Sequence, residues 1–252
     1  ARLPITRAVS FSHPRDGRFV FAFPWEGVVL AGTTDVDHHH SLDEEPSISA
    51  GEYEYLLEAL DHVFPDLELG PQDVQATFSG VRPVVGTGKT DPSKESREHV
   101  LWCEQGLITV AGGKLTTFRI MALAALKMAS AQLKDRVRGL RDEERVLDRM
   151  PPESSVNAPV SPGSRLRLLG RYGAECEALV AAAQTGEFDC VPGTGSLWAE
   201  LRWAARMEAV CHLEDLLLRR VRLGLILPQG GLPLAGRIRA IVQNELGWDD
   251  RR

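Results

Sequence analysis

The features that the sequence lacks exclude several classes of protein. No apolar run approaches the roughly 20 residues needed to span a bilayer, and no secretory signal peptide is visible. The four cysteines are widely separated and form no Cys-x-x-Cys or His/Cys cluster, which argues against a zinc site. We therefore expect reduced thiols in a cytoplasmic protein and no metal centre.

Two phosphate-binding motifs are also missing. Residues 86–90 superficially resemble a P-loop, but Pro83 stands where that motif requires its first glycine. No Gly-x-Gly-x-x-Gly turn, which cradles a dinucleotide pyrophosphate, occurs anywhere in the chain. The run His38–His40 lies beside acidic residues, so we expect a solvated loop there rather than metal ligands.

The composition is that of a globular protein with a packed core. The chain has 252 residues, of which 43% are apolar and 25% charged. Its formal net charge of −6 disfavours a dedicated nucleic-acid binder. The first residue is Ala1 rather than Met, and strand-like sequence follows almost at once, so we expect a fragment of a longer protein.

Runs of β-favouring residues predict two hairpins and one further strand. Residues 18–23 and 28–33 flank turn-forming residues, as do residues 97–103 and 107–111. Residues 74–82 are predicted to form a single strand that stops at Pro83.

Helices are predicted from apolar spacing and capping residues. Ser49 and Glu52 have the spacing of a capping box, and a helix should follow them. Further helices are predicted over residues 115–133, 166–172, 175–184, 197–223 and 235–246.

The order of these elements predicts an α+β fold with a separate helical domain. Residues 1–133 carry the hairpins and two helices, and residues 134–163 are charged and then rich in proline and serine, as in an extended linker. Residues 164–252 should form an all-α domain.

The segment from Leu107 to Leu133 has the layout of a binding site. A strand ends at Gly112 and Gly113, and a helix begins just after Lys114, so backbone N–H groups and a positive helix dipole face any ligand there. Arg82, Arg97 and Lys114 all lie at strand or turn boundaries. Each one singly suits a structural ion pair, whereas three in one pocket would suit a dianionic ligand.

Several motifs together resemble the FAD-dependent (quinone-linked) glycerol-3-phosphate dehydrogenases. They occur in a suitable order and cover essentially the whole chain. The motifs are Phe23-Pro24-Trp25, Gly32-Thr33-Thr34-Asp35, Ser79-Gly80-Val81-Arg82-Pro83, Pro92-Ser93 with Ser96-Arg97, Gly112-Gly113-Lys114-Leu115-Thr116-Thr117, Arg171-Tyr172-Gly173, and residues 213–220.

The resemblance implies the carboxy-terminal half of such an enzyme. This half would contain part of the substrate-domain antiparallel sheet, the strand and helix that return to the FAD domain, and the helical domain. The family oxidises sn-glycerol 3-phosphate to dihydroxyacetone phosphate by hydride transfer to FAD and passes electrons to quinone. Because the pyrophosphate-binding turn is absent, we expect the isolated chain to be inactive and not to retain FAD.

The resemblance also implies roles for individual residues. Gly112, Gly113, Leu115 and Thr116 would lie along the flavin, with their N–H groups facing its pyrimidine edge. The three cations would contact different parts of the substrate. Arg82 and Lys114 would act near the C2 hydroxyl as catalytic and substrate-binding residues, and Arg97 would anchor the phosphate, although two of these cations could be exchanged. Thr33, Thr34 and Asp35 are interpreted as structural.

Three alternatives stay open. The parent enzyme could be an oxidase that uses oxygen, or the fragment could be a non-catalytic helical interaction module. Arg219, Arg220 and Arg222 could contact nucleic acid or the anionic inner face of the cytoplasmic membrane, but pairing with Glu214 or Asp215 is favoured. A homodimer is compatible with the sequence.

Overall fold

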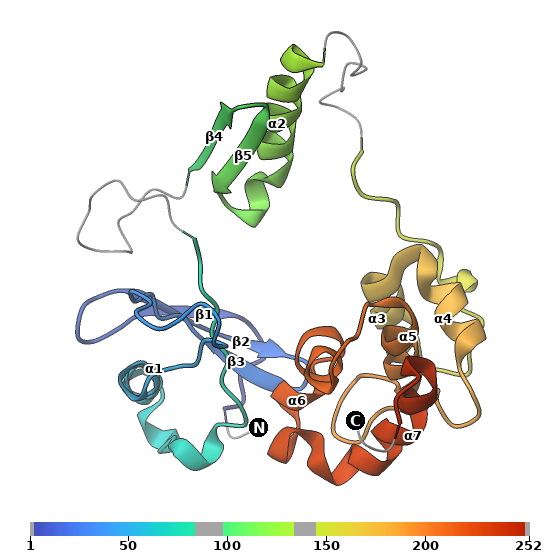
Figure 1. The fold of residues 1–252 in the computed structure, drawn as a ribbon. Helices are drawn as coiled ribbons and strands as arrows, with labels where there is room; N and C mark the ends of the chain where they lie inside the picture. The colour runs from blue at the N-terminus through green and yellow to red at the C-terminus, as the bar shows by residue number, and fades with distance from the viewer. Residues whose placement is uncertain (1–2, 84–97, 134–144, 250–252) are drawn as a thin grey trace. The chain divides into compact units, whose positions relative to one another are not determined.

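The chain forms two compact units. The computed structural model describes residues 3–83, 98–133 and 145–249, and Figure 1 shows its elements. The first unit comprises Ala1–Thr33, Ile48–Phe78 and Asp148–Arg252, and the second comprises Thr34–Ser47 and Ser79–Leu147. Small antiparallel sheets and a helical carboxy-terminal region confirm the predicted α+β fold.

The first unit begins with a three-stranded antiparallel sheet in the order β1-β2-β3 (Figure 1). Strands β2 (Phe19–Trp25) and β3 (Val28–Gly32) form the predicted hairpin, and β1 (Val9–Ser12) was not predicted. Because side chains alternate along β2, Val20 and Ala22 are buried on one face while Phe19 and Phe21 are exposed on the other.

Helix α1 (Ala50–Val63) packs against this sheet, and its start is the predicted capping box. The Ser49 hydroxyl accepts a hydrogen bond from the Glu52 N–H at 3.2 Å, and the Glu52 carboxylate accepts one from the Ser49 N–H at 3.0 Å. Leu60 of α1 joins Leu3 and Ala22 in a small core. The capping residues therefore fix where the helix begins, and its apolar side fixes how it packs.

The β1–β2 turn is bound to α1 by polar contacts around Tyr55. The buried His13 ring stacks on the Tyr55 ring at 3.5 Å and bonds the Tyr55 carbonyl oxygen through Nε2 at 2.9 Å. The Tyr55 hydroxyl donates to Asp16 at 3.0 Å, and Asp16 also accepts hydrogen bonds from the N–H and Nε of Arg18. The turn is thus held by side chains as well as by the strand ladder.

The second unit contains the other predicted hairpin and the helix predicted over residues 115–133. Strands β4 (His99–Glu104) and β5 (Leu107–Gly112) are antiparallel, and α2 (Phe118–Gln132) packs along them (Figure 1). At the far end of α2, the Gln132 side-chain amide donates to the Cys103 sulfur at 2.8 Å.

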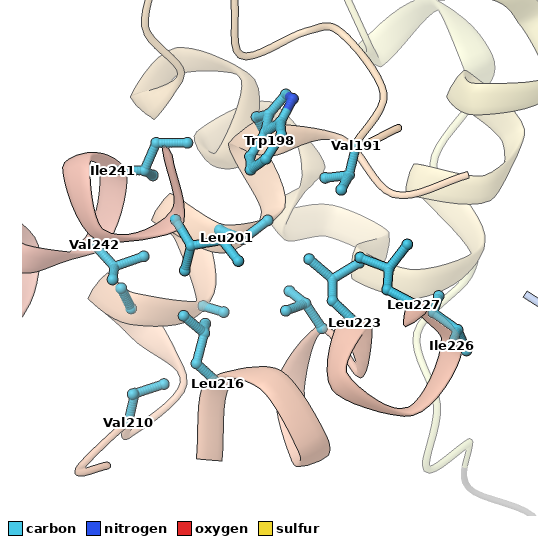
Figure 2. Close-up of a cluster of buried hydrophobic side chains, with 14 residues drawn as sticks. Val191, Trp198, Leu201, Val210, Leu216, Leu223, Ile226, Leu227, Ile241 and Val242 are labelled. Carbon is cyan, nitrogen blue, oxygen red and sulfur yellow. The ribbon is translucent and has the colours of Figure 1, made fainter. Parts of the chain in front are cut away.

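The carboxy-terminal region of the first unit is helical. Its helices are α3 (Pro162–Tyr172), α4 (Cys176–Ala182), α5 (Trp198–Met207), α6 (Leu223–Ile226) and α7 (Ala235–Leu246). One core gathers Trp198, Leu201, Leu223, Ile241 and neighbouring apolar residues, as Figure 2 shows. A second core packs α3 and α4 against the other side of α5.

Two predicted elements are wrong. Residues 74–82 join no strand, and Phe78 and Val81 are exposed there, because β propensity forms a strand only where a neighbouring strand can pair with it. The predicted helix over residues 197–223 is divided into α5, a π-helical turn (Asp215–Arg220) and α6. Ala209 and Arg222 have φ values of +50° and +58°, which an α-helix does not accommodate.

The segment predicted as an extended linker contributes to the core in its second half. Val156 and Ala158 are buried against α3 and α4. Residues 134–144 lie outside the described part of the chain. The predicted domain limits of 1–133, 134–163 and 164–252 remain a prediction. The two compact units have boundaries at other residues.

The core around α5 should dominate the stability of the helical region. Leu201 is fully buried, so Leu201→Ala removes apolar contacts and leaves a cavity. We expect a loss of about 2–5 kcal/mol in the free energy of unfolding, measured by urea denaturation and circular dichroism. Leu232→Ala, at a leucine that is 68% exposed, is the control and should change it by less than about 0.5 kcal/mol. Equal effects of the two substitutions would contradict this packing.

Acid should weaken the β1–β2 turn through Asp16. The N–H of Arg18, then the Arg18 and Tyr55 side chains, hold the pKa of Asp16 at about 2, below its ordinary 3.8. As pH falls through this interval the unfolded chain takes up the proton first, so the stability that Asp16 contributes is lost. The difference in unfolding free energy between wild type and Asp16→Asn should therefore shrink from about pH 4 to pH 2 and stay constant above about pH 5. A constant difference over the whole range would refute the role of this carboxylate.

Candidate functional site

The predicted strand-to-helix turn is present and needs glycine at both of its central positions. Strand β5 ends at Gly112, where φ is +72°, and φ at Gly113 is +86°. Residues that carry a side chain rarely adopt backbone conformations in this left-handed region. A Cβ atom on Gly113 would also lie 2.4 Å from the Met121 sulfur on α2. The turn is therefore fixed both by its backbone conformation and by the helix that packs on it.

Lys114 stands at the start of the helical segment, and Thr117 fixes its backbone. The Thr117 hydroxyl accepts a hydrogen bond from the Lys114 N–H at 3.2 Å and donates one to the Lys114 carbonyl at 2.9 Å. A single 3-10 turn, Leu115–Thr117, follows, and α2 begins at Phe118. The sequence placed Thr117 in a motif but gave no sign of this bonding role.

The beginning of this helix is suited to an electron-rich group. The first N–H groups of a helix have no acceptor within it, and those of Leu115 and Thr116 stand at that position. No acidic side chain lies in the first turn of either helical segment, and Lys114 adds a positive charge. Backbone donors, helix dipole and ammonium group therefore favour negative charge at one place.

The same turn is open to solvent and carries apolar side chains. The side chains of Lys114 and Thr116 are exposed, and Leu115 is 89% exposed. Phe118 and Ile120 are also exposed at the start of α2. An open, partly apolar surface beside backbone donors could accept a flat ring system that has polar edges.

Arg82 is engaged in an ion pair with a carboxylate that the sequence placed in a structural cluster. One guanidinium nitrogen of Arg82 lies 2.8 Å from Oδ2 of Asp35 and 3.1 Å from Oδ1. This is the structural pairing expected for each cation taken singly. It also assigns Asp35 a partner that local sequence does not reveal.

The convergence of three cations on one pocket stays a prediction. Arg97 lies outside the described residues. Arg82 is paired with Asp35, and the Lys114 backbone is bonded to Thr117. Gly112, Gly113, Lys114, Leu115 and Thr116 are brought together by the turn itself.

The basic cluster near the end of the helix predicted over residues 197–223 forms contacts within the protein. Arg219 pairs with Glu214 and Asp215, as predicted. Arg220 instead donates to the Glu208 carbonyl at 2.6 Å, and Arg222 lies against Glu26 and the Trp25 ring. These contacts favour a structural role for all three arginines.

Two other kinds of feature are absent from the described residues. No group of three or more His, Cys, Asp or Glu side chains is placed to hold a metal ion among the residues described. No helix within residues 3–83, 98–133 and 145–249 is both long and apolar enough to cross a membrane.

The chain matches two protein-family models that together cover almost all of it. A model described as FAD dependent oxidoreductase matches residues 2–131. A model described as the C-terminal domain of alpha-glycerophosphate oxidase matches residues 127–252. The junction of the two models falls at the end of α2.

Individual relatives carry consistent names. The aerobic glycerol-3-phosphate dehydrogenase of Staphylococcus haemolyticus is 31% identical over 240 residues, which are 87% of this chain and 43% of the relative. The Staphylococcus epidermidis protein of the same name is 30% identical with the same coverage. The chain therefore spans less than half the length of these relatives.

A solved structure shares the fold. The glycerol-3-phosphate dehydrogenase of Bacillus halodurans, complexed with FAD, aligns with a TM-score of 0.73 and 22% identity. The alignment covers 99% of this chain and 51% of that one. The chain thus belongs to the FAD dependent oxidoreductase family and continues into the C-terminal domain found in alpha-glycerophosphate oxidase.

Proposed function

We propose that this chain supplies the flavin-facing turn and substrate-binding cations of an enzyme that oxidises sn-glycerol 3-phosphate to dihydroxyacetone phosphate. The observation that carries the proposal is the turn Gly112–Lys114, which joins strand β5 to the beginning of a helix. The chain that contains this turn belongs to the FAD dependent oxidoreductase family. The names of its relatives indicate the substrate.

The residues of the turn fit the edge of a flavin. FAD, when bound, supplies the acceptor for the hydride that leaves C2 of the substrate. Gly112 and Gly113 lack side chains that would hold a ring system away from the backbone, and the N–H groups of Leu115 and Thr116 begin a helix. Donors held in place before the reaction stabilise negative charge without having to reorganise.

The cations would bind the substrate and stabilise its negative charge. Lys114 and Arg82 would stabilise the alkoxide-like C2 oxygen as hydride leaves, and Arg97 would hold the phosphate by paired hydrogen bonds. The ammonium group of Lys114 is exposed beside the turn, where a ligand can reach it. The ion pair with Asp35 already limits the directions in which the Arg82 guanidinium can point.

The isolated chain should be inactive in this proposal because the half that binds the FAD pyrophosphate is missing from it. Quinone is the proposed electron acceptor, which would bring the complete enzyme to the inner face of the cytoplasmic membrane. Oxygen is the alternative acceptor, since one matching domain is named for an oxidase.

The function is tested with two preparations. The chain alone should show no visible flavin absorbance after purification and no oxidation of glycerol 3-phosphate. A polypeptide that joins the chain to a dinucleotide-binding half should oxidise glycerol 3-phosphate and reduce a soluble quinone analogue, while oxygen uptake would favour the oxidase. If the joined, flavin-loaded protein reduces neither acceptor with glycerol 3-phosphate, the substrate assignment is wrong.

Substitution of the cations tests their roles in that joined protein. Arg82→Ala or Lys114→Ala should lower kcat by about 10²-fold or more, because each removes charge stabilisation at C2. Arg97→Ala should mainly raise KM. Lys127→Ala removes an exposed cation from the same helix as the turn and serves as the control. Steady-state kinetics that are unchanged in all three site variants would exclude these roles.

A further inference from the structure

The β2–β3 turn carries a residue that its backbone does not favour. Glu26 has a φ of +49° and is followed by Gly27 at +92°. The β4–β5 turn has the same form, with Gln105 at +51° and Gly106 at +84°. Two-residue hairpin turns with positive φ favour asparagine, aspartate or glycine at the first position. A glutamate at this position therefore needs another explanation.

The Glu26 carboxylate supplies that explanation because it faces three guanidinium groups of the helical region. One carboxylate oxygen lies 3.3 Å from Nη2 of Arg167 on α3. The other oxygen lies 3.8 Å from a terminal nitrogen of Arg171 and 3.8 Å from one of Arg222. The side chain of Glu26 is 21% exposed, so these attractions are only partly screened by water.

A second carboxylate completes the cluster from the buried side. Glu200 on α5 accepts hydrogen bonds from Arg167 at 2.6 Å and from the Tyr172 hydroxyl at 2.9 Å. Burial and the Glu200 charge raise the pKa of Tyr172, which therefore stays a donor. Burial alone would lower the pKa of Arg167, but Glu200 and Glu26 raise it, so this guanidinium is charged and bridges the two carboxylates.

Apolar contacts place the turn on the same surface. Trp25 and Val28, on either side of the turn, pack against the core that contains Leu223 and Leu227. The Arg222 guanidinium lies over the Trp25 ring, 5.4 Å from its centroid. The hairpin thus contacts the helical region through two partly buried side chains that pack against the core and through one charged turn residue.

We propose that Glu26 is an electrostatic latch that holds the β2–β3 hairpin on the helical region. With Glu26 present, two carboxylates face three guanidiniums. Without it, Glu200 remains the partner of Arg167 and Arg171. Arg222 loses its carboxylate partner and keeps its contact with the Trp25 ring. The like charges then repel one another across a partly buried site, and the hairpin separates from α3 more often.

Hydrogen exchange of the whole chain, read by mass spectrometry, tests the latch. In Glu26→Gln the turn residue matches the glutamine already used in the β4–β5 turn, so charge changes while turn geometry is kept. Amides of β2, β3 and α3 should exchange about tenfold faster, whereas those of β4 and β5 should not change. Glu104→Gln, which removes a carboxylate beside the other hairpin turn, is the matched control and should leave β2, β3 and α3 unchanged.

A second variant separates the latch from the turn preference. Glu26→Asn places a favoured residue in the turn but shortens and neutralises the side chain. The latch predicts faster exchange in β2, β3 and α3, whereas a hairpin held by turn geometry alone would exchange more slowly. Exchange at or below the wild-type rate in both Glu26 variants overturns the proposal, as does a uniform increase over all helices.

The pairing with Arg222 can be measured by a double-mutant cycle. Arg222→Gln should speed exchange of the same segments. In the variant that combines Glu26→Gln with Arg222→Gln, the fold-increase in exchange rate should be smaller than the product of the two single fold-increases. Strictly multiplicative effects would show that Glu26 and Arg222 do not interact, and would contradict the latch at this contact.

Discussion

The helical region depends on the burial of α5. Eight of its ten residues are buried, and two of these, Glu200 and Arg202, are charged. A helix buried on all sides must receive partners for its charges from other elements. Glu187 and Glu245 supply them for Arg202, and Arg167 and Tyr172 for Glu200. Burial would raise the pKa of Glu187, but hydrogen bonds from Arg202 lower it, so the pair is ionised in the interior.

The fold was predictable wherever its cause is local. Capping by Ser49 and Glu52, alternation along β2 and the glycines that follow β5 all act within a few residues, and each element was found from the sequence. The helix predicted over residues 197–223 failed because its apolar spacing continues through Ala209 and Arg222, whose backbone conformations are set by packing. Val156 looked like part of a linker because only its neighbours in space, on α3 and α4, make it a core residue.

The candidate site divides in the same way. The turn Gly112–Thr117 is contiguous, so its strand, glycines and helix start can be inferred from one stretch. The pairing of Arg82 with Asp35 joins residues 47 positions apart, and that of Glu26 with Arg167 joins residues 141 positions apart. No local pattern identifies such partners, although a lone cation at a strand boundary does signal that a partner is needed.

The Arg82–Asp35 pair has a consequence for any anion that reaches this guanidinium. Asp35 is already in the position of a bound carboxylate, so a ligand must compete with a group that is covalently tethered and always present at high effective concentration. Such a tethered competitor weakens the initial binding of an anion and speeds its departure. Arg82 is therefore suited to a ligand that is exchanged at every turnover rather than to one that is retained.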